Sequence, residues 1–197
     1  LVGSEMCIRD RGDFCYSDEE FEIIREEVKM FRELGADGVV IGILMPEGEL
    51  DVERMRKLVK EAEGMSVTLH RAFDMCIAPQ EALEEAVALG IRTILTSGQR
   101  NSAAEGADLL ELLVELADNR ITIMPGAGVS PENLPLLIEQ TKAKAFHMTG
   151  KKVTEGRMRY RQPQVSMGSA QMDEYKIILT DEEQIRRARK ILDGALA

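Results

Sequence analysis

A histidine, an arginine and an aspartate lie within five residues of one another in the segment His70-Arg71-Ala72-Phe73-Asp74. A neutral imidazole can transfer protons near pH 7, and a guanidinium can bind a carboxylate or phosphate through two parallel hydrogen bonds. A nearby carboxylate can orient either group. The segment therefore predicts a site that binds a small anion and moves protons. The alternative is structural: Asp74 pairs with Arg71 to brace a loop, and His70 fills the core.

The second histidine and a glycine-rich loop could contribute to the same chemistry. His147 falls in a predicted strand at residues 143–148, where it is either a site residue or a core residue. Residues 124–130 join another predicted strand to a predicted helix, and they include Gly126 and Gly128. Glycines let the backbone approach a ligand closely, and a helix N-terminus offers N–H groups to an anion. The loop is therefore either an anion-binding loop or a tight turn.

The cysteines give little support to a metal site. Cys7, Cys15 and Cys76 are an odd number without paired spacing, which argues against a disulfide framework and a zinc site and is typical of a reducing cytosol. Cys15 and Cys76 each follow the end of a predicted element, so we expect them to be exposed. They are weak candidate ligands for a soft ion such as Cu(I), because thiols, imidazoles and thioethers suit it but no cluster of them exists.

The overall composition limits the classes of partner that the chain can bind. The chain of 197 residues has 25 Lys and Arg against 35 Asp and Glu, a formal net charge of −10. An acidic chain lacks the basic surface that binding to a phosphate backbone needs, so we expect no nucleic-acid partner. No run approaches eighteen apolar residues, so we also expect no membrane-spanning helix.

Helix and strand patterns alternate along most of the chain. Helix starts are predicted by the capping residues Ser17, Asp51, Ser130 and Thr180 and by the proline at position 79. Each predicted strand is short, apolar and flanked by helices, which is typical of a parallel sheet covered on both faces. The predicted strands span residues 38–44, 66–70, 92–96, 121–124 and 143–148, and residues 149–179 are predicted to form a long loop.

Two parallel architectures fit this α/β pattern. A doubly wound open sheet needs five or six strands, whereas a (β/α)8 TIM barrel needs eight and about 250 residues. Residues 1–11 have no helical or strand period and resemble the translation of a sequencing-library adapter, so we expect them to be non-native. The remaining residues 12–197 start with a predicted helix. We therefore expect one domain, an incomplete TIM barrel that lacks about its first three strands.

Seven motifs in order resemble the CutC copper homeostasis protein family, over essentially all of residues 12–197. They are Gly-Asp-Phe-x-Tyr-Ser at 12–17, Leu-Gly-Ala-Asp-Gly-Val-Val at 34–40, His-Arg-Ala-Phe-Asp-Met at 70–75, Ile-Leu-Thr-Ser-Gly-Gln at 94–99, Met-Pro-Gly-x-Gly-Val at 124–129, Phe-His at 146–147 and Val-Ser-Met-Gly at 165–168. The resemblance implies a cytoplasmic (β/α)8 barrel that self-associates and is linked to copper.

The resemblance also implies a set of site residues at strand ends and mouth loops. The implied catalytic residues are His70, Arg71, Asp74 and His147, and the implied ligand-binding residues are Asp13, Ser97, Gly126 and Gly128. The chain departs from the family pattern at Ala127, where glycine is usual. It also lacks the Glu-x-Cys segment found near the family's N-terminus, so a copper site that uses that cysteine cannot form in this chain.

Two functions follow as hypotheses. The first is copper homeostasis, with copper ion as the bound partner. The second is an enzyme that acts on a small anionic metabolite, including a phosphorylated one, at the carboxyl-end mouth of the barrel. In that case His70 transfers protons, Arg71 binds the anion together with the glycine loop, and Asp74 orients them.

Overall fold

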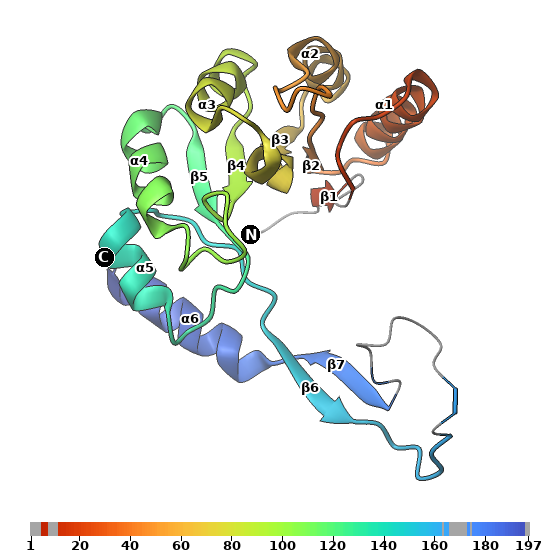
Figure 1. Cartoon of the computed structure of the whole chain (residues 1–197), viewed down its shortest axis with the longest axis vertical. Helices are drawn as coiled ribbons and strands as arrows, with labels where there is room; N and C mark the ends of the chain where they lie inside the picture. Colours follow the sequence, from red (N-terminus) through yellow and green to blue (C-terminus); the bar gives the residue numbers. More distant parts are fainter. Residues whose placement is uncertain (1–4, 8–11, 163, 166–172, 174, 196–197) are drawn as a thin grey trace.

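The computed structural model describes residues 5–7, 12–162, 164–165, 173 and 175–195. Its centre is a five-stranded parallel sheet in the order β1-β2-β3-β4-β5, and Figure 1 shows the helices α1 to α4 along the outer side of that sheet. The strands are β1 (Glu5–Cys7), β2 (Gly38–Ile41), β3 (Ser66–Leu69), β4 (Thr93–Thr96) and β5 (Thr122–Pro125). The helices between them are α1 (Asp18–Glu33), α2 (Val52–Glu61), α3 (Pro79–Ala88) and α4 (Ala107–Ala117), and α5 (Leu134–Thr141) follows β5.

The strand order distinguishes the two candidate architectures. Each described strand of the sheet pairs with its neighbour in sequence, for example Gly38 with Ser66 and Thr93 with Thr122. A doubly wound sheet reverses its order at a switch point, whereas the wall of a TIM barrel does not. The parallel α/β sheet is therefore TIM-barrel-like.

The expected strands 38–44, 66–70, 92–96 and 121–124 correspond to β2 to β5. The expected strand at 143–148 was wrong: its one backbone hydrogen bond to β5 in the described region runs from the N–H of His147 to Pro125 O at 2.9 Å. One bond holds the segment beside β5 but does not form a ladder.

Residues 149–179 are only partly a loop. They contain β6 (Lys151–Glu155) and most of β7 (Lys176–Thr180), which pair antiparallel, and α6 (Glu182–Ala195) follows. Figure 1 shows this hairpin extending away from the sheet, while α6 returns beside α5.

Residues 5–7 form a strand where none was expected. Their backbone pairs with Gly38–Val40 along the outer edge of β2. The edge of a parallel sheet presents unpaired N–H and C=O groups, and any extended segment within reach can satisfy them. This pairing therefore carries no information about whether residues 1–11 are native, which stays a prediction.

The capping predictions hold for the first helices. Ser17 and Glu20 form the reciprocal capping box of α1, Asp51 accepts the N–H of Arg54, and Pro79 begins α3. Two later starts shift. The helix expected after Ser130 begins at Leu134, and at α6 the carboxylate of Asp181, rather than the hydroxyl of Thr180, accepts the N–H of Glu183.

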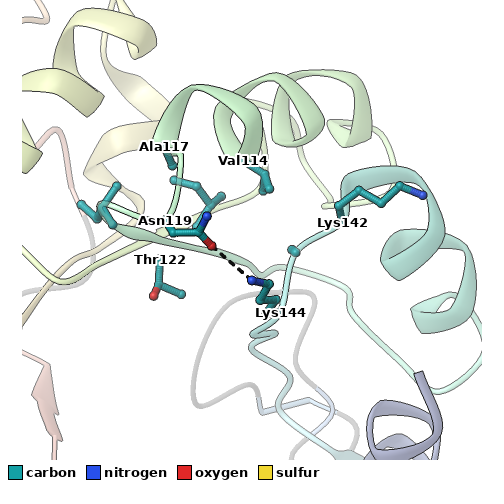
Figure 2. Close-up of a pocket in the computed structure, with 9 residues that line it drawn as sticks. Val114, Ala117, Asn119, Thr122, Lys142 and Lys144 are labelled. Atoms are coloured by element: carbon teal, nitrogen blue, oxygen red, sulfur yellow. Dashed lines mark hydrogen bonds between the residues drawn. The ribbon is translucent and has the colours of Figure 1, made fainter. Parts of the chain in front are cut away.

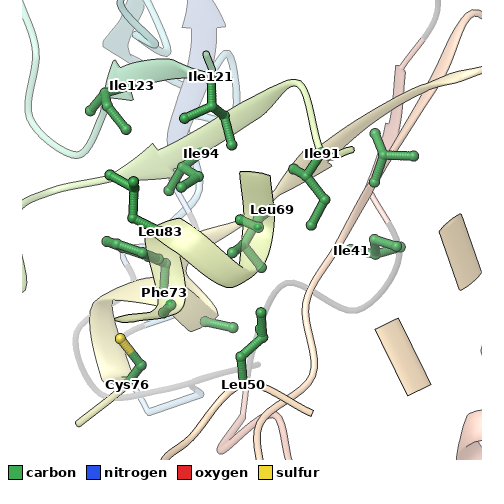
Figure 3. Close-up of a cluster of buried hydrophobic side chains, with 14 of the residues drawn as sticks. Ile41, Leu50, Leu69, Phe73, Cys76, Leu83, Ile91, Ile94, Ile121 and Ile123 are labelled. Atoms are coloured by element: carbon green, nitrogen blue, oxygen red, sulfur yellow. The ribbon is translucent and has the colours of Figure 1, made fainter. Parts of the chain in front are cut away.

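The core lies between the sheet and its helices, as Figure 3 shows. Strand residues such as Ile41, Leu69 and Ile94 are fully buried, and they meet Leu83 from α3 and Phe73 from the short 3-10 helix η1 (Arg71–Met75). Burying one such side chain stabilises the fold by about 1.5–3 kcal/mol. This packing holds the carboxyl ends of β3 and β4 in fixed positions.

Two glycines let the loop after β4 lie directly against the start of α4. A Cβ at Gly106 would lie 1.9 Å from Ser97 O, and a Cβ at Gly98 would lie 2.3 Å from Gly106 O. Neither position has room for a methyl group, because the obstructing atoms belong to the backbone. The position of Ser97 therefore depends on a glycine nine residues later.

Gly106→Ala should lower the free energy of unfolding by about 1–3 kcal/mol or more, the usual cost of overpacking, because the backbone must move. Urea unfolding followed by circular dichroism measures this. Gly194→Ala is the matched control, because a Cβ at Gly194 meets nothing within 4 Å. An unchanged midpoint for Gly106→Ala would show that the loop and α4 are not in contact.

Candidate functional site

A hollow of about 550 Å³ lies at the carboxyl ends of the strands. It brings together His70 and Arg71 after β3, Gly128 after β5, and His147 from the segment beside β5. The residues lining it are His70, Arg71, Leu95, Ala127, Gly128, Val129, His147, Met148, Thr149 and Lys151. This is the end of a parallel α/β sheet where ligands bind.

Asp74 is the hub that fixes the geometry under this hollow. Its side chain is only 6% exposed. One oxygen accepts the hydroxyl of Thr96 at 2.5 Å and the N–H of Gln99 at 3.0 Å, and the N–H of Ser97 lies 3.0 Å from both oxygens. The carboxylate of η1 thus joins the end of β3 to the loop after β4. These contacts show that Asp74 braces the loop, which is the structural role considered for it.

Arg71 is held by the same network. Its Nε donates to Asp74 Oδ2 at 2.6 Å, and its Nη2 donates to Ser97 Oγ at 2.8 Å and to Arg100 O at 3.2 Å. Within the described residues, Nη1 has no hydrogen-bond partner, and the side chain is partly exposed at the hollow. Arg71 is therefore a guanidinium with one edge fixed by protein and another edge available to a ligand.

His70 is buried, with 3% of its surface exposed. Its N–H donates to Ile41 O at 3.0 Å, and its Nδ1 accepts the N–H of Ala72 at 3.2 Å. Because an accepting nitrogen carries no proton, this bond favours the neutral tautomer with its proton on Nε2. The imidazole packs against Phe14, with ring centroids 4.9 Å apart.

Gly42 makes room for that imidazole. A Cβ at position 42 would lie 2.7 Å from both Nδ1 and Cε1 of His70 and 2.9 Å from the Cβ of Ala72. Sequence patterns did not single out Gly42. The only available signal was a glycine inside an apolar strand run, which often marks the close approach of another group.

His147 is exposed at the edge of the hollow, in contrast to the buried His70. It also lies beside the glycine loop, because a Cβ at Gly126 would be 3.5 Å from the Cβ of His147. Its backbone N–H donates to Pro125 O, and this hydrogen bond holds the residue beside β5. Of the two imidazoles, His147 has the better access to a bound ligand.

The loop after β5 is strained at Ala127, where we expected the chain to depart from the glycine usual in the family it resembles. Ala127 has φ +68° and Gly128 has φ +74°, a backbone region that favours glycine. The helix N-terminus expected beside this loop is displaced, and the N–H of Ser130 donates to Asn133 Oδ1 at 2.9 Å. Anion binding by that helix N-terminus therefore loses its structural basis, and the side chains of the hollow remain.

Several predicted residues support the hollow or lie apart from it. Neither Ser97 nor Gly126 is among the lining residues. Ser97 contacts Arg71 and Asp74, and Gly126 packs against Leu95, which does line the hollow. Asp13 accepts the N–H of Cys15 at 3.1 Å and is not among the lining residues. Lys151 was not predicted, because it lies in a segment expected to be an unpatterned loop.

A shallower groove of about 120 Å³ lies at the opposite end of the sheet. Figure 2 shows its lining residues, among them Asn119, Thr122 and Lys144, with Lys144 Nζ donating to Asn119 Oδ1 at 3.1 Å. It lies at the amino end of β5, where barrel residues contribute to stability rather than catalysis. The chemistry-bearing side chains thus favour the hollow at the carboxyl end.

Comparison with known proteins places the chain in a family. The CutC family model matches residues 2–152. The chain belongs to the CutC family. A CutC family protein of Chromobacterium violaceum is 45% identical over 189 residues, which cover 95% of this chain and 76% of that protein. In the described residues, no helix is long and apolar enough to span a membrane.

Solved structures agree with this assignment. The CutC protein of Streptococcus agalactiae, whose name assigns it to copper homeostasis, has a TM-score of 0.68 at 35% identity, covering 72% of this chain and 70% of that one. Thiamine phosphate pyrophosphorylase of Pyrococcus furiosus has a TM-score of 0.56 at 16% identity, covering 98% and 83%. At that identity the likeness shows the fold alone.

The thiols fit a copper site poorly. Cys76, expected to be exposed, is buried, and burial raises the pKa of its thiol to about 11. Burial, Asp13 and Glu47, in that order, also raise the pKa of the Cys15 thiol. Thiolates are the form that binds Cu(I), and raised pKa values disfavour them. No group of three or more His, Cys, Asp or Glu side chains in the described region is arranged to hold a metal ion.

Cys76 should react with iodoacetamide at pH 8 roughly 100-fold more slowly than an ordinary thiol. A pKa raised from 9.0 to about 11 cuts the thiolate fraction by about that factor, and burial slows access further. The rate should rise about tenfold per pH unit up to the thiol's own pKa. Mass spectrometry of a time course in a Cys7→Ser background measures this, with the half-buried Cys15 as internal comparison. Rapid labelling of Cys76 in the folded protein would contradict the assignment.

Proposed function

We propose that the chain is an enzyme that binds a small anionic metabolite, of the phosphate or carboxylate class, in the hollow at the carboxyl ends of its strands. The supporting observation is that Arg71, Lys151 and His147 line one hollow. Two of these side chains are cationic, and the third is an imidazole, a group that commonly serves in proton transfer. Arg71 is also prepared for binding, because Asp74 holds its guanidinium in one orientation.

Under this proposal each residue of the hollow has a distinct role. Arg71 binds the anion through the guanidinium edge that protein does not use, and Lys151 adds charge. His147 is the proton-transfer group, because it is the exposed imidazole. His70 orients the site rather than moving protons, since protonation at Nδ1 would break its bond from Ala72. This changes the role expected for His70 from proton transfer to orientation.

Arg71→Lys should weaken binding of inorganic phosphate at least about tenfold, or 1.4 kcal/mol, because lysine loses the two-pronged geometry. Isothermal titration calorimetry with phosphate and a set of small phosphorylated and carboxylated metabolites measures this. Lys144→Gln removes a cation at the opposite end of the sheet and is the control for net charge. If no anion in the set binds, or if both variants lose affinity equally, the proposed site is wrong.

Copper binding is the second candidate. Its support is the copper homeostasis name of the Streptococcus agalactiae relative together with His147 and Met148 in the hollow, since imidazole and thioether bind Cu(I). Here copper ion would be cargo rather than a catalyst. In a titration with Cu(I), this function requires binding that His147→Gln and Met148→Leu both weaken.

The free thiols Cys15 and Cys76 support the cytoplasm as the compartment.

We also propose that β2 to β5, with the segment 143–148 beside β5, are the later part of a closed (β/α)8 barrel that lacks about its first three strands here. The sequential strand order and the 76% coverage of the relative from Chromobacterium violaceum support it. In a closed barrel β1 would be replaced by a longer strand, and both sheet edges would be paired.

A chain in which residues 1–11 are replaced by the residues that its gene encodes upstream of Gly12 should melt more cooperatively than the 197-residue chain. It should also bind less 1-anilinonaphthalene-8-sulfonate, because closing the barrel covers apolar surface and open edges. Differential scanning calorimetry and dye fluorescence measure the two effects. Equal cooperativity and equal dye binding would show that the sheet is complete without further strands.

A further inference from the structure

The wall of the hollow is partly apolar. Leu95, Val129 and Met148 line it together with the polar groups of the proposed site. Leu95 and Met148 are partly exposed, and Val129 keeps 8% of its surface exposed. A ligand that covers apolar surface gains binding free energy from it, whereas a hydrated inorganic anion gains none. The wall therefore favours an anion that carries an apolar body.

Two glycines leave room for these apolar side chains. A Cβ at Gly126 would lie 2.5 Å from Leu95 Cδ1. A Cβ at Gly150 would lie 3.5 Å from Met148 Cε and 2.8 Å from Cγ1 of Ile185, which belongs to α6. The apolar wall is thus supported by the loop after β5 on one side and by α6 on another. Gly126, expected to bind a ligand directly, is placed to position Leu95 instead.

The net charge of the hollow is small. Asp74 pairs with Arg71 at 2.6 Å and is only 6% exposed, so this pair adds no net charge. Lys151 forms no ion pair within the described part of the chain, and none of the lining residues is acidic. With its imidazoles counted as neutral, the hollow carries one positive charge, while the whole chain carries −10. Such a field penalises a dianion more than a monoanion.

Arg71 offers one nitrogen to a ligand. Its Nε and Nη2 already donate to Asp74, Ser97 Oγ and Arg100 O, which leaves Nη1 among the described contacts. The ammonium of Lys151 is a second donor at the hollow. A carboxylate has two oxygens, one for each donor group, whereas a phosphate ester brings a third oxygen and a charge of nearly −2. The donors and the net charge therefore both favour one carboxylate.

The hollow is larger than a carboxylate alone requires. Its volume of about 550 Å³ falls within the range of about 300–1,000 Å³ that is typical of sites for drug-sized ligands. Once a carboxylate occupies the cationic side, most of this volume remains beside the apolar wall. A body of several carbons fits that space.

We propose that the ligand of this hollow is a small monocarboxylate with an apolar body of several carbons. Its carboxylate would bind Nη1 of Arg71 and the ammonium of Lys151, and its body would lie along Leu95 and Met148. This inference rests on the proposed function and narrows its anion from phosphates and carboxylates in general to one kind of carboxylate.

The test is a comparison of five anions on the full gene product, with dissociation constants measured by titration in nuclear magnetic resonance. Hexanoate is the probe. Acetate lacks its body, gluconate has the same six carbons with hydroxyl groups, adipate ends in a second carboxylate, and hexyl phosphate has the more highly charged head. We expect hexanoate to bind at least about tenfold more tightly than each of the others, because each buried methylene contributes about fourfold.

Variants at Met148 test where the body lies. Met148→Gln should weaken hexanoate at least about fivefold and acetate less than about twofold, because only hexanoate reaches the apolar wall. Met148→Leu should restore hexanoate binding to within about threefold of the parent, since leucine is also apolar. Met30→Gln is the matched control, because Met30 lies on α1, is 46% exposed and does not line the hollow. Circular dichroism checks that each variant is folded.

The outcomes distinguish this inference from the proposed function. If neither the five anions nor inorganic phosphate binds, both are wrong. If gluconate, adipate or hexyl phosphate binds as tightly as hexanoate, the anion site is retained and the apolar monocarboxylate is wrong. The same holds if Met148→Gln and Met30→Gln have equal effects, because the body would then lie elsewhere.

Discussion

The carboxylate of Asp74 is the interaction on which the candidate site depends. It joins a short helix after β3 to the loop after β4, and it orients Arg71 while accepting two backbone N–H groups and the Thr96 hydroxyl. A buried carboxylate with this many donors is well satisfied, and removing it would leave several donors without partners at once. Under the proposed function, stability and ligand recognition would therefore share one side chain, which would combine the two interpretations of the His70–Asp74 segment.

Burial reverses the roles that we expected for the two histidines. His70 caps η1 by accepting the N–H of Ala72 at Nδ1, and its ring packs on Phe14, whereas His147 lies at the edge of the hollow that Met148 and Lys151 also line. Membership of the CutC family fixes neither ligand, because the same hollow offers cations to an anion and soft donors to a copper ion. The thiols argue against copper, since Cys76 is buried and burial raises the pKa of its thiol to about 11.

Periodicity predicted the parts of the fold whose faces have consistent environments. The strands β2 and β3 are mostly buried, β4 and β5 bury alternate residues, and helices flank all four, so their apolar runs predicted them, as the Ser17 and Asp51 caps predicted α1 and α2. The hairpin was missed because neither of its faces packs on the core, which leaves no burial pattern to read. Residues 143–148 have strand composition but one ladder bond, so pairing rather than propensity decided the outcome. For the site, the end of an expected strand located His70 and Arg71, whereas His147 was singled out in a strand that does not form. The support from Gly42 depends on a close approach that one sequence does not show.

The hydrogen atom that serves as the side chain of Gly42 constrains how this site can change over evolutionary time. One added carbon there would collide with the ring of the residue at position 70, so the two positions cannot vary independently. A larger residue at position 42 requires both the ring at position 70 and the side chain at position 72 to move or change, because each would lie within 3 Å of the added carbon. Descendants that keep the ring therefore keep the glycine with it.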